Sequence, residues 1–262
     1  MSDKPHLWLH EMTWPEAERI ALETSIVMVP MGSTEQHGPH LPEGTDTFVP
    51  ARLAEIVAEA TGVPIAPPVW FSTCEQHMGF SGTISLRPTT LILLLRDICE
   101  SLGRHGFRDV VLLNGHLRGA EPTLLAAIDE IQLALPELKI WAVDLNQIAI
   151  EELREACESD VFPHAEELEA SQMLVIRPDL VHLEQAVDVD GDATAGPTRG
   201  FPRGGIAQRL TADEFRQASP AGILGLATRG TALKGRAILD AQARQIVRFV
   251  DELPRRRLAE RG

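Results

Sequence analysis

Imidazole and carboxylate side chains gather in one short stretch of the chain, Gly32 to His40, and just beyond it. Glu35, His37 and His40 lie in this stretch, and Asp46 follows shortly after it. Imidazole and carboxylate together suit borderline divalent ions such as zinc, manganese and iron. Glu35 and His37 stand two residues apart, so an extended turn would point both side chains the same way. The stretch therefore predicts a metal site.

Three more candidate ligands occur later in the chain. His116 follows a short apolar run, and His164 and Glu167 stand three residues apart, which would place them on one face of a helix. Any one of these residues alone is more often a structural polar group than a ligand. As a set, most of them follow predicted strands, where ligands of α/β proteins bind, and this favours a functional site.

The elements that must position these residues alternate between strand and helix. Apolar, β-branched runs predict strands, and apolar spacing of three to four residues predicts helices. The predicted strands are 25–30, 63–69, 109–114 and 139–143, and the predicted helices are 48–60, 89–105, 121–135, 166–176 and 228–253. This alternation predicts a parallel sheet with helices on both faces. Residues 187–205 are rich in Gly and Pro and are interpreted as a lid or a subunit contact.

Other catalytic motifs are absent from the sequence. Ser33 is not in a Gly-x-Ser-x-Gly context, and no glycine-rich phosphate loop or dinucleotide fingerprint follows a predicted strand. Cys74 precedes His77 by three residues, and on a strand such residues point apart, so a cysteine nucleophile activated by this histidine is disfavoured. The metal site remains the preferred interpretation.

Composition limits the classes of partner. The 262 residues carry a formal net charge of −14, which argues against binding to nucleic acid or to anionic lipid. No apolar run is long enough to span a membrane, and the N-terminus has no stretch of signal-peptide type. Three widely spaced cysteines without a Cys-x-x-Cys pair predict a reducing compartment, so we expect a cytoplasmic protein with a small-molecule substrate.

Several segments together resemble the creatininase (creatinine amidohydrolase) family. They are Gly-Ser-Thr-Glu-Gln-His-Gly-Pro-His-Leu-Pro at 32–42, the segments 75–86 and 104–116, His-Ala-Glu-Glu-Leu-Glu-Ala-Ser at 164–171, and the glycine-containing stretch 222–235. The resemblance covers nearly the whole chain and implies one domain over residues 1–262. It implies a three-layer α/β/α sandwich with a mostly parallel sheet, a homohexamer, and two divalent metal ions (zinc, manganese or iron).

The resemblance also implies a role for each site residue. Asp46 would bridge the two metals, Glu35 and His116 would hold one of them, and His37 would hold the other. His40 becomes a structural residue. In creatininase a further glutamate ligand stands two residues after the histidine that matches His116.

That position is Arg118 here. The resemblance therefore points to Glu167 as the fifth ligand or a proton shuttle. His164 would give a proton to the leaving nitrogen, and His77 and Arg118 would contact the substrate. Arg118 suits an anionic or polyhydroxylated substrate, and its alternative role is a salt bridge within the turn.

The expected reaction is hydrolysis of an amide-like C–N bond other than a peptide bond, in a cyclic amide or a formamide. Metal-activated water would attack the polarised carbonyl. Creatinine itself is not expected, because residues 159–164 lack the tryptophan that creatininase has there and Leu117 replaces its tyrosine. Two alternatives stay open: hydrolysis or ring opening of a cyclic keto-polyol, and a non-catalytic binding or maturation protein with the same fold.

Overall fold

A parallel three-stranded sheet forms the centre of the molecule. The structure is a computed structural model that describes residues 7–159, 163–189 and 210–259, without the side chains of 117–121 and 255–259. Strands β1 (Ile26–Met31), β2 (Asp109–Asn114) and β3 (Lys139–Asp144) pair in that order, all parallel. Ile26 is opposite Asp109, which is opposite Lys139, so the strands end together at one edge.

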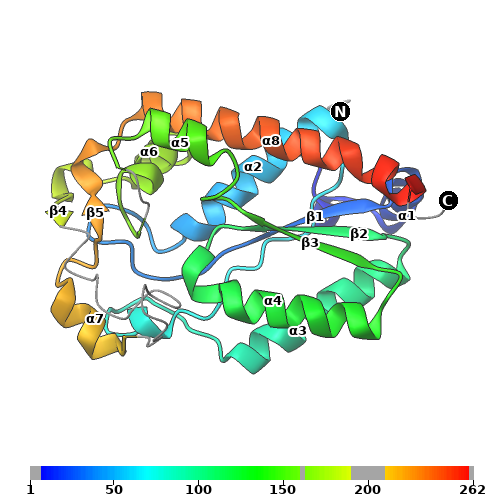
Figure 1. Cartoon of the computed structure of the whole chain (residues 1–262), viewed down its shortest axis with the longest axis horizontal. Coiled ribbons are helices and arrows are strands. Elements are labelled where there is room, and N and C mark those ends of the chain that lie inside the picture. Colours follow the sequence, from blue (N-terminus) through cyan, green and yellow to red (C-terminus); the bar gives the residue numbers. More distant parts are fainter. Residues whose placement is uncertain (1–6, 160–162, 190–209, 260–262) are drawn as a thin grey trace.

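Helices cover both faces of this sheet (Figure 1). Because every residue of β1 and β2 is buried, neither strand has a solvent-facing side. Ile26 and Met28 belong to one apolar cluster, and the alternate residue Val27 belongs to the cluster on the opposite face. On the first face lie α2 (Thr45–Thr61), α6 (Glu167–Ile176) and α8 (Ala232–Ala259), and on the second lie α1 (Trp14–Thr24), α3 (Pro88–Arg104) and α4 (Leu117–Ala134). This arrangement confirms the predicted α/β/α layers.

The predicted strand at 63–69 does not form a regular strand. The segment runs alongside β1 and makes isolated parallel bridges, Ile65 with Met28 and Val69 with Met31. Pro64, Pro67 and Pro68 lack backbone N–H groups, so they cannot complete a ladder of hydrogen bonds. The segment still closes the edge of the sheet beside β1.

Smaller elements gather near the carboxyl ends of the strands. They are the 3₁₀ turn η2 (Glu75–His77), the helices α5 (Ile150–Ala156) and α7 (Ala212–Ala218), and the antiparallel pair β4 (Asp188–Val189) and β5 (Gly225–Leu226). Most of the segment 187–205, interpreted as a lid or a subunit contact, lies outside the described residues, from 190 onward. Within the described residues, no helix is both long and apolar enough to cross a bilayer.

Helices α2 and α4 begin several residues earlier than the sequence pattern predicts, and both begin at candidate ligands. Helix α2 starts at Thr45 rather than Phe48, which places Asp46 in its first turn, and α4 starts directly after His116. A carboxylate in the first turn of a helix is favoured by the partial positive charge of the helix N-terminus. The carboxyl ends of the strands and the start of α2 therefore meet at Asp46.

Candidate metal centre

The carboxylate of Asp46 lies between two imidazoles. His37, in the loop after β1, places its Nε2 3.0 Å from Asp46 Oδ1. His116, at the end of β2, places its Nδ1 2.8 Å from Asp46 Oδ2. Ser33 Oγ also donates a hydrogen bond to Oδ2 at 2.8 Å. Each carboxylate oxygen thus faces a different histidine, which is the arrangement of a bridging carboxylate.

The outer nitrogen of each imidazole is held by a backbone carbonyl. His37 Nδ1 donates to the carbonyl of Glu35 at 3.0 Å, and His116 Nε2 donates to the carbonyl of Thr73 at 3.0 Å. A hydrogen bond of this kind selects the tautomer whose other nitrogen can bind a metal. His37 Nε2 and His116 Nδ1 are the nitrogens that face Asp46.

Two further carboxylates complete two ligand groups that share Asp46. The first group is Glu35, Asp46 and His116, and the second is His37, Asp46 and Glu169, with the donor atoms of each group within 4.8 Å of one another. Glu35 Oε2 is buried, lies 3.3 Å from His116 Nδ1 and has no hydrogen-bond partner among the described residues.

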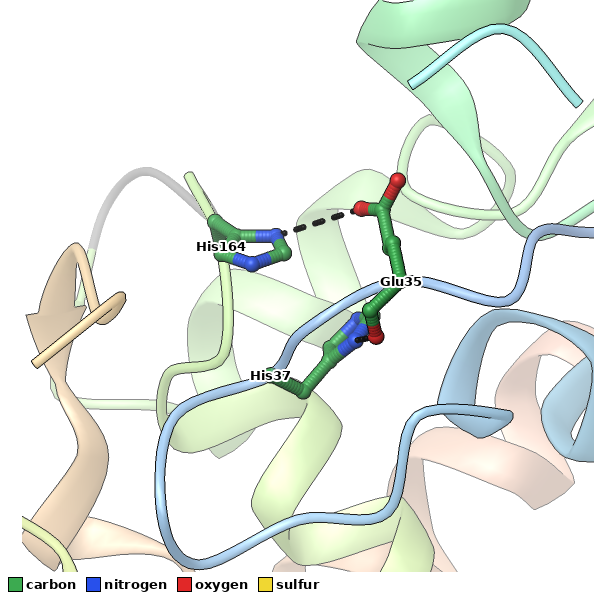
Figure 2. A group of neighbouring side chains, drawn as sticks. All are labelled: Glu35, His37 and His164. Carbon is green, nitrogen blue, oxygen red and sulfur yellow. Dashed lines mark hydrogen bonds and ion pairs between the residues drawn. The ribbon is translucent and has the colours of Figure 1, made fainter. Parts of the chain in front are cut away.

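Glu35, His37 and His164 form a third group with the same span. In Figure 2 the Glu35 carboxylate and the His164 ring point toward one another, and His37 lies beneath them.

Glu167 does not belong to these groups. Glu169 instead lies in the position that was expected for Glu167. The Glu167 carboxylate accepts hydrogen bonds from the backbone N–H groups of Glu158 and Ser159 and pairs with Lys234 Nζ. Glu169 Oε2 instead lies 3.7 Å from His37 Nε2.

His164 and Glu167 do not share a helix face, as was expected, because α6 begins only at Glu167. Ala165, just after His164, has φ 52°, so the chain is not helical there and the rule for residues three apart does not apply. The backbone N–H of Ala165 donates to Glu169 Oε2 at 2.6 Å and turns this carboxylate toward His37. Among the described residues, the ligand groups therefore include Glu169 and do not include Glu167, which was the expected ligand.

The electrostatics of the cluster fit a cation. Burial lowers the pKa of His37, but the Asp46 carboxylate and other acids raise it by more, so the resulting pKa is about 10. Burial likewise opposes ionisation of Asp46, yet the two histidines hold the pKa of this carboxyl well below its ordinary value. Burial and neighbouring carboxylates raise the pKa of Glu169 to about 7, although His37 opposes this shift. Among the described residues, no lysine or arginine pairs with Glu35, Asp46 or Glu169, so protons supply the positive charge that a metal would provide.

Two neutral histidines line the other side of Glu35. Glu35 Oε1 lies 3.5 Å from His77 Nε2 and 3.7 Å from His164 Nδ1. The two rings stack with centroids 4.4 Å apart, and Phe215 of α7 packs edge-on against His77. Burial lowers the pKa of His77 to about 3 and that of His164 well below its ordinary value.

The structure thus brings His77, a predicted substrate-binding residue, beside the ligand groups, and it places His164, a predicted catalytic residue, in the third of them. The side chain of Arg118 lies outside the described part of the chain.

His40 and Cys74 are buried near the centre but belong to none of the described ligand groups. Burial lowers the pKa of His40 to about 4, which keeps it neutral and agrees with a structural role. Burial, with Glu35 nearby, raises the pKa of the Cys74 thiol, and its Sγ lies 3.3 Å from the carbonyl of Ile84. A thiol that resists ionisation is a poor nucleophile.

Gln36 is a residue of the centre that the sequence analysis did not single out. Its amide Nε2 lies 3.0 Å from His77 Nδ1 and 2.9 Å from His164 Nε2. Its position between two candidate ligands, Glu35 and His37, was the available signal.

Comparisons with known proteins relate this chain to one family of hydrolases. The family model described as creatininase, creatinine amidohydrolase, matches residues 10–250. Creatinine amidohydrolase of Pseudomonas putida is 30% identical over an alignment of 266 positions, which covers 94% of this chain and 96% of that protein. Mycofactocin precursor peptide peptidase of Mycolicibacterium smegmatis is 34% identical over 219 residues, 81% of this chain and 79% of the relative. The 3-dehydro-scyllo-inosose hydrolase of Thermotoga maritima is 32% identical over 191 residues, 70% of this chain but only 60% of the relative's length.

The fold also matches solved structures. A crystal structure of creatinine amidohydrolase (creatininase) superposes with a TM-score of 0.81 at 27% identity, covering 95% of this chain and 98% of that one. Related creatininase structures are described as a manganese form and a zinc–zinc form. The family match spans most of the sequence, the fold agrees over nearly its whole length, and the ligand groups suit metal ions. This chain belongs to the creatininase family of hydrolases.

Proposed function

We propose that this chain binds two divalent metal ions, zinc, manganese or iron, and hydrolyses an amide-like C–N bond. The observation that carries the proposal is the Asp46 carboxylate, whose two oxygens face His37 and His116 at 3.0 and 2.8 Å. Glu35, Asp46 and His116 would hold one ion, and His37, Asp46 and Glu169 would hold the other. When bound, such ions polarise a substrate carbonyl and bring the pKa of a bound water toward neutrality.

The remaining steps belong to side chains of the chain itself. His164 and His77 lie within 3.7 Å of Glu35 and are neutral, so each ring carries one N–H and one lone pair. A proton taken from the attacking water must reach the leaving nitrogen. Glu167 is engaged with Lys234 and lies outside the ligand groups, so the proposed proton carrier is His164.

The class of amide is a finer proposal, and we propose a cyclic amide or a formamide rather than a peptide. Creatinine amidohydrolase is named for a small amide, and one creatininase structure is described as a complex with creatine. The peptidase relative is named for a peptide precursor, so peptide substrates must be tested beside small amides.

A second candidate function is hydrolysis of a cyclic keto-polyol. The observation that favours it is the similarity to a relative named as a hydrolase of 3-dehydro-scyllo-inosose. The same ligand groups would serve, because a carbonyl is the group attacked in both reactions.

One experiment tests the metal centre and separates these substrates. Protein purified without chelators is analysed for zinc, manganese and iron, and the loaded enzyme is assayed on creatinine, other cyclic amides, formamides, short peptides and cyclic keto-polyols. We expect two ions per chain and turnover of one class. An Asp46→Ala protein that keeps both ions and full activity would refute the proposal. Empty, inactive wild-type protein would favour the non-catalytic alternative.

The cytoplasmic location and the hexamer also remain proposals. Light scattering of the purified protein would measure its mass in solution, and fractionation of cells would locate it. A monomer in solution would contradict the predicted assembly.

A further inference from the structure

The side-chain amide of Gln36 has an orientation that its backbone neighbours determine. The backbone N–H of Gly38 donates to Gln36 Oε1 at 3.0 Å, and Gln36 Nε2 donates to the carbonyl of Gly222 at 3.1 Å. A backbone N–H can only donate and a carbonyl can only accept, so the amide cannot be turned around. The amide is also tightly enclosed: a Cβ on Gly222 would lie 1.9 Å from Oε1. The nitrogen that faces the two imidazoles is therefore a hydrogen-bond donor.

His164 has a different and unambiguous acceptor. Its Nε2 lies 2.8 Å from the backbone carbonyl of Gln36, which requires that Nε2 carry the hydrogen. A nitrogen that donates to a carbonyl cannot also accept from the Gln36 amide, although the two nitrogens are only 2.9 Å apart. The lone pair of neutral His164 must then be on Nδ1, which faces Glu35.

The second hydrogen of the Gln36 amide is left for His77. His77 Nδ1 lies 3.0 Å from Gln36 Nε2 and must accept this hydrogen, so neutral His77 carries its own hydrogen on Nε2. His77 Nε2 lies 3.5 Å from Glu35 Oε1. Gln76 Nε2 lies 3.1 Å from His77 Nε2, but two donors cannot bond each other. The side-chain amide of Gln76 must therefore be rotated so that its oxygen and nitrogen exchange places and the oxygen accepts from His77.

We infer that Gln36 is a positioning residue that gives the two stacked histidines opposite roles: His77 offers an N–H beside Glu35, and His164 offers a lone pair. Only the catalytic use of these roles rests on the proposed function. In hydrolysis, His164 Nδ1 accepts the proton of the attacking water and later returns it to the leaving nitrogen, while His77 Nε2–H donates a hydrogen bond to the substrate. This assignment makes His164 a base first and an acid second.

Nitrogen NMR of zinc-loaded protein labelled with ¹⁵N-histidine reads the tautomers directly. Signals are assigned by their loss in His77→Asn and His164→Asn. We expect a protonated Nε2 and an unprotonated Nδ1 on both rings of the wild type. A hydrogen on Nδ1 of either ring would overturn the inference.

A Gln36→Glu variant sharpens the test because it removes the donor to His77, and the one to the carbonyl of Gly222, but leaves the backbone acceptor of His164 in place. A carboxylate in this place can accept but not donate, so the hydrogen of His77 should move to Nδ1. His164 should not change, because its acceptor is a backbone carbonyl. A His77 ring that keeps its tautomer in this variant would contradict the role of Gln36, and a simultaneous change in both rings would indicate a general structural effect instead.

Kinetics test whether the reaction uses these roles. Gln36→Met should lower kcat by about 10- to 100-fold, as loss of an orienting partner does, with both metal ions retained and KM little changed. Gln242→Met is the matched control: Gln242 is also buried, and its amide bonds Gln172 and the carbonyl of Leu145. The control should leave kcat unchanged.

Equal kcat in the Gln36→Met and wild-type proteins would refute the catalytic use. A wild type that turns over none of the substrates would instead refute the proposed function, and the NMR result would still decide the tautomers.

Discussion

At the scale of single residues, two glutamates of one segment have opposite environments. Glu169 lies among the ligand groups, and Glu167 is held by Lys234 and two backbone N–H groups. We expect Glu169→Gln to lose one of the two bound ions. Its activity should fall at least as far as when a partner that supports a metal ligand is removed, which costs roughly 10–100-fold. Glu167→Gln should keep both ions and lower the free energy of unfolding by about 1–3 kcal/mol. Metal analysis and urea unfolding measure both effects, and metal loss in Glu167→Gln alone would reverse our assignment.

Protons in the metal-free cluster predict how metal affinity depends on pH. With a pKa of about 10, His37 is protonated at neutral pH, and a metal that binds its nitrogen must displace that proton. Apparent affinity should therefore rise with pH, about tenfold per unit for each proton released, until the pH approaches that pKa. Glu169, with a pKa of about 7, is partly protonated at neutral pH, so it adds to the release there and in more acidic solution. Calorimetry in buffers of different ionisation enthalpy counts the protons, and zinc binding without release at neutral pH would contradict this prediction.

At the scale of elements, two glycines allow the first turn of α2 to reach the ends of β1 and β2. A Cβ on Gly32 would lie 2.2 Å from the backbone oxygen of Asp46, and one on Gly115 would lie 2.1 Å from the same atom. Either alanine substitution should push α2 away, with a loss of metal and about 1–3 kcal/mol of stability.

Gly103→Ala, inside α3, is the control for these two variants. Its Cβ would make only ordinary contacts with Leu138, and it should be neutral or stabilise the protein by up to about 1 kcal/mol. Metal titration and thermal unfolding compare the three variants. Full metal affinity in both Gly32→Ala and Gly115→Ala would show that the close approach is not required.

At the scale of the whole molecule, Lys234 connects the C-terminal helix to the segment that leads to the site. Its Nζ donates to Glu167 and, at 3.1 Å, to Glu158, which joins the start of α8 to α6 and to the chain before His164. Lys234→Met leaves the buried Glu167 carboxylate without its cation. Removing one partner of a buried ion pair lowers the free energy of unfolding by about 3–5 kcal/mol, and we expect a smaller loss here because backbone N–H groups still bond the carboxylate.

The double variant Lys234→Met/Glu167→Gln removes the unpaired charge and should recover part of the stability. Urea unfolding of the wild type, the two single variants and the double variant measures the interaction between the two residues. Additive losses in the two single variants would show that the pair does not act as a unit.

The sequence alone predicted much of the fold and several residues of the candidate metal centre. Strands β1 and β2 were predicted to within one residue, because each is apolar on both faces and such runs have few alternatives. Glu35, His37, Asp46 and His116 were also named in advance, because they follow strands that end at one edge of the sheet or resemble a family motif. Short helices such as α5 and α7 were not predicted, since so few residues carry little periodicity.

Only the tertiary structure decided which later residues complete the site. The choice between Glu167 and Glu169 depends on the positive φ of Ala165, which delays the start of α6 and which no local pattern showed. Lys234, distant in sequence, pairs with Glu167, which lies outside the ligand groups. The role of Gln36 depends on contacts with His77, His164 and Gly222, which three separate segments bring together. Residue types and spacing thus predict the chemistry available to the chain, whereas contacts between distant segments select the atoms that perform it.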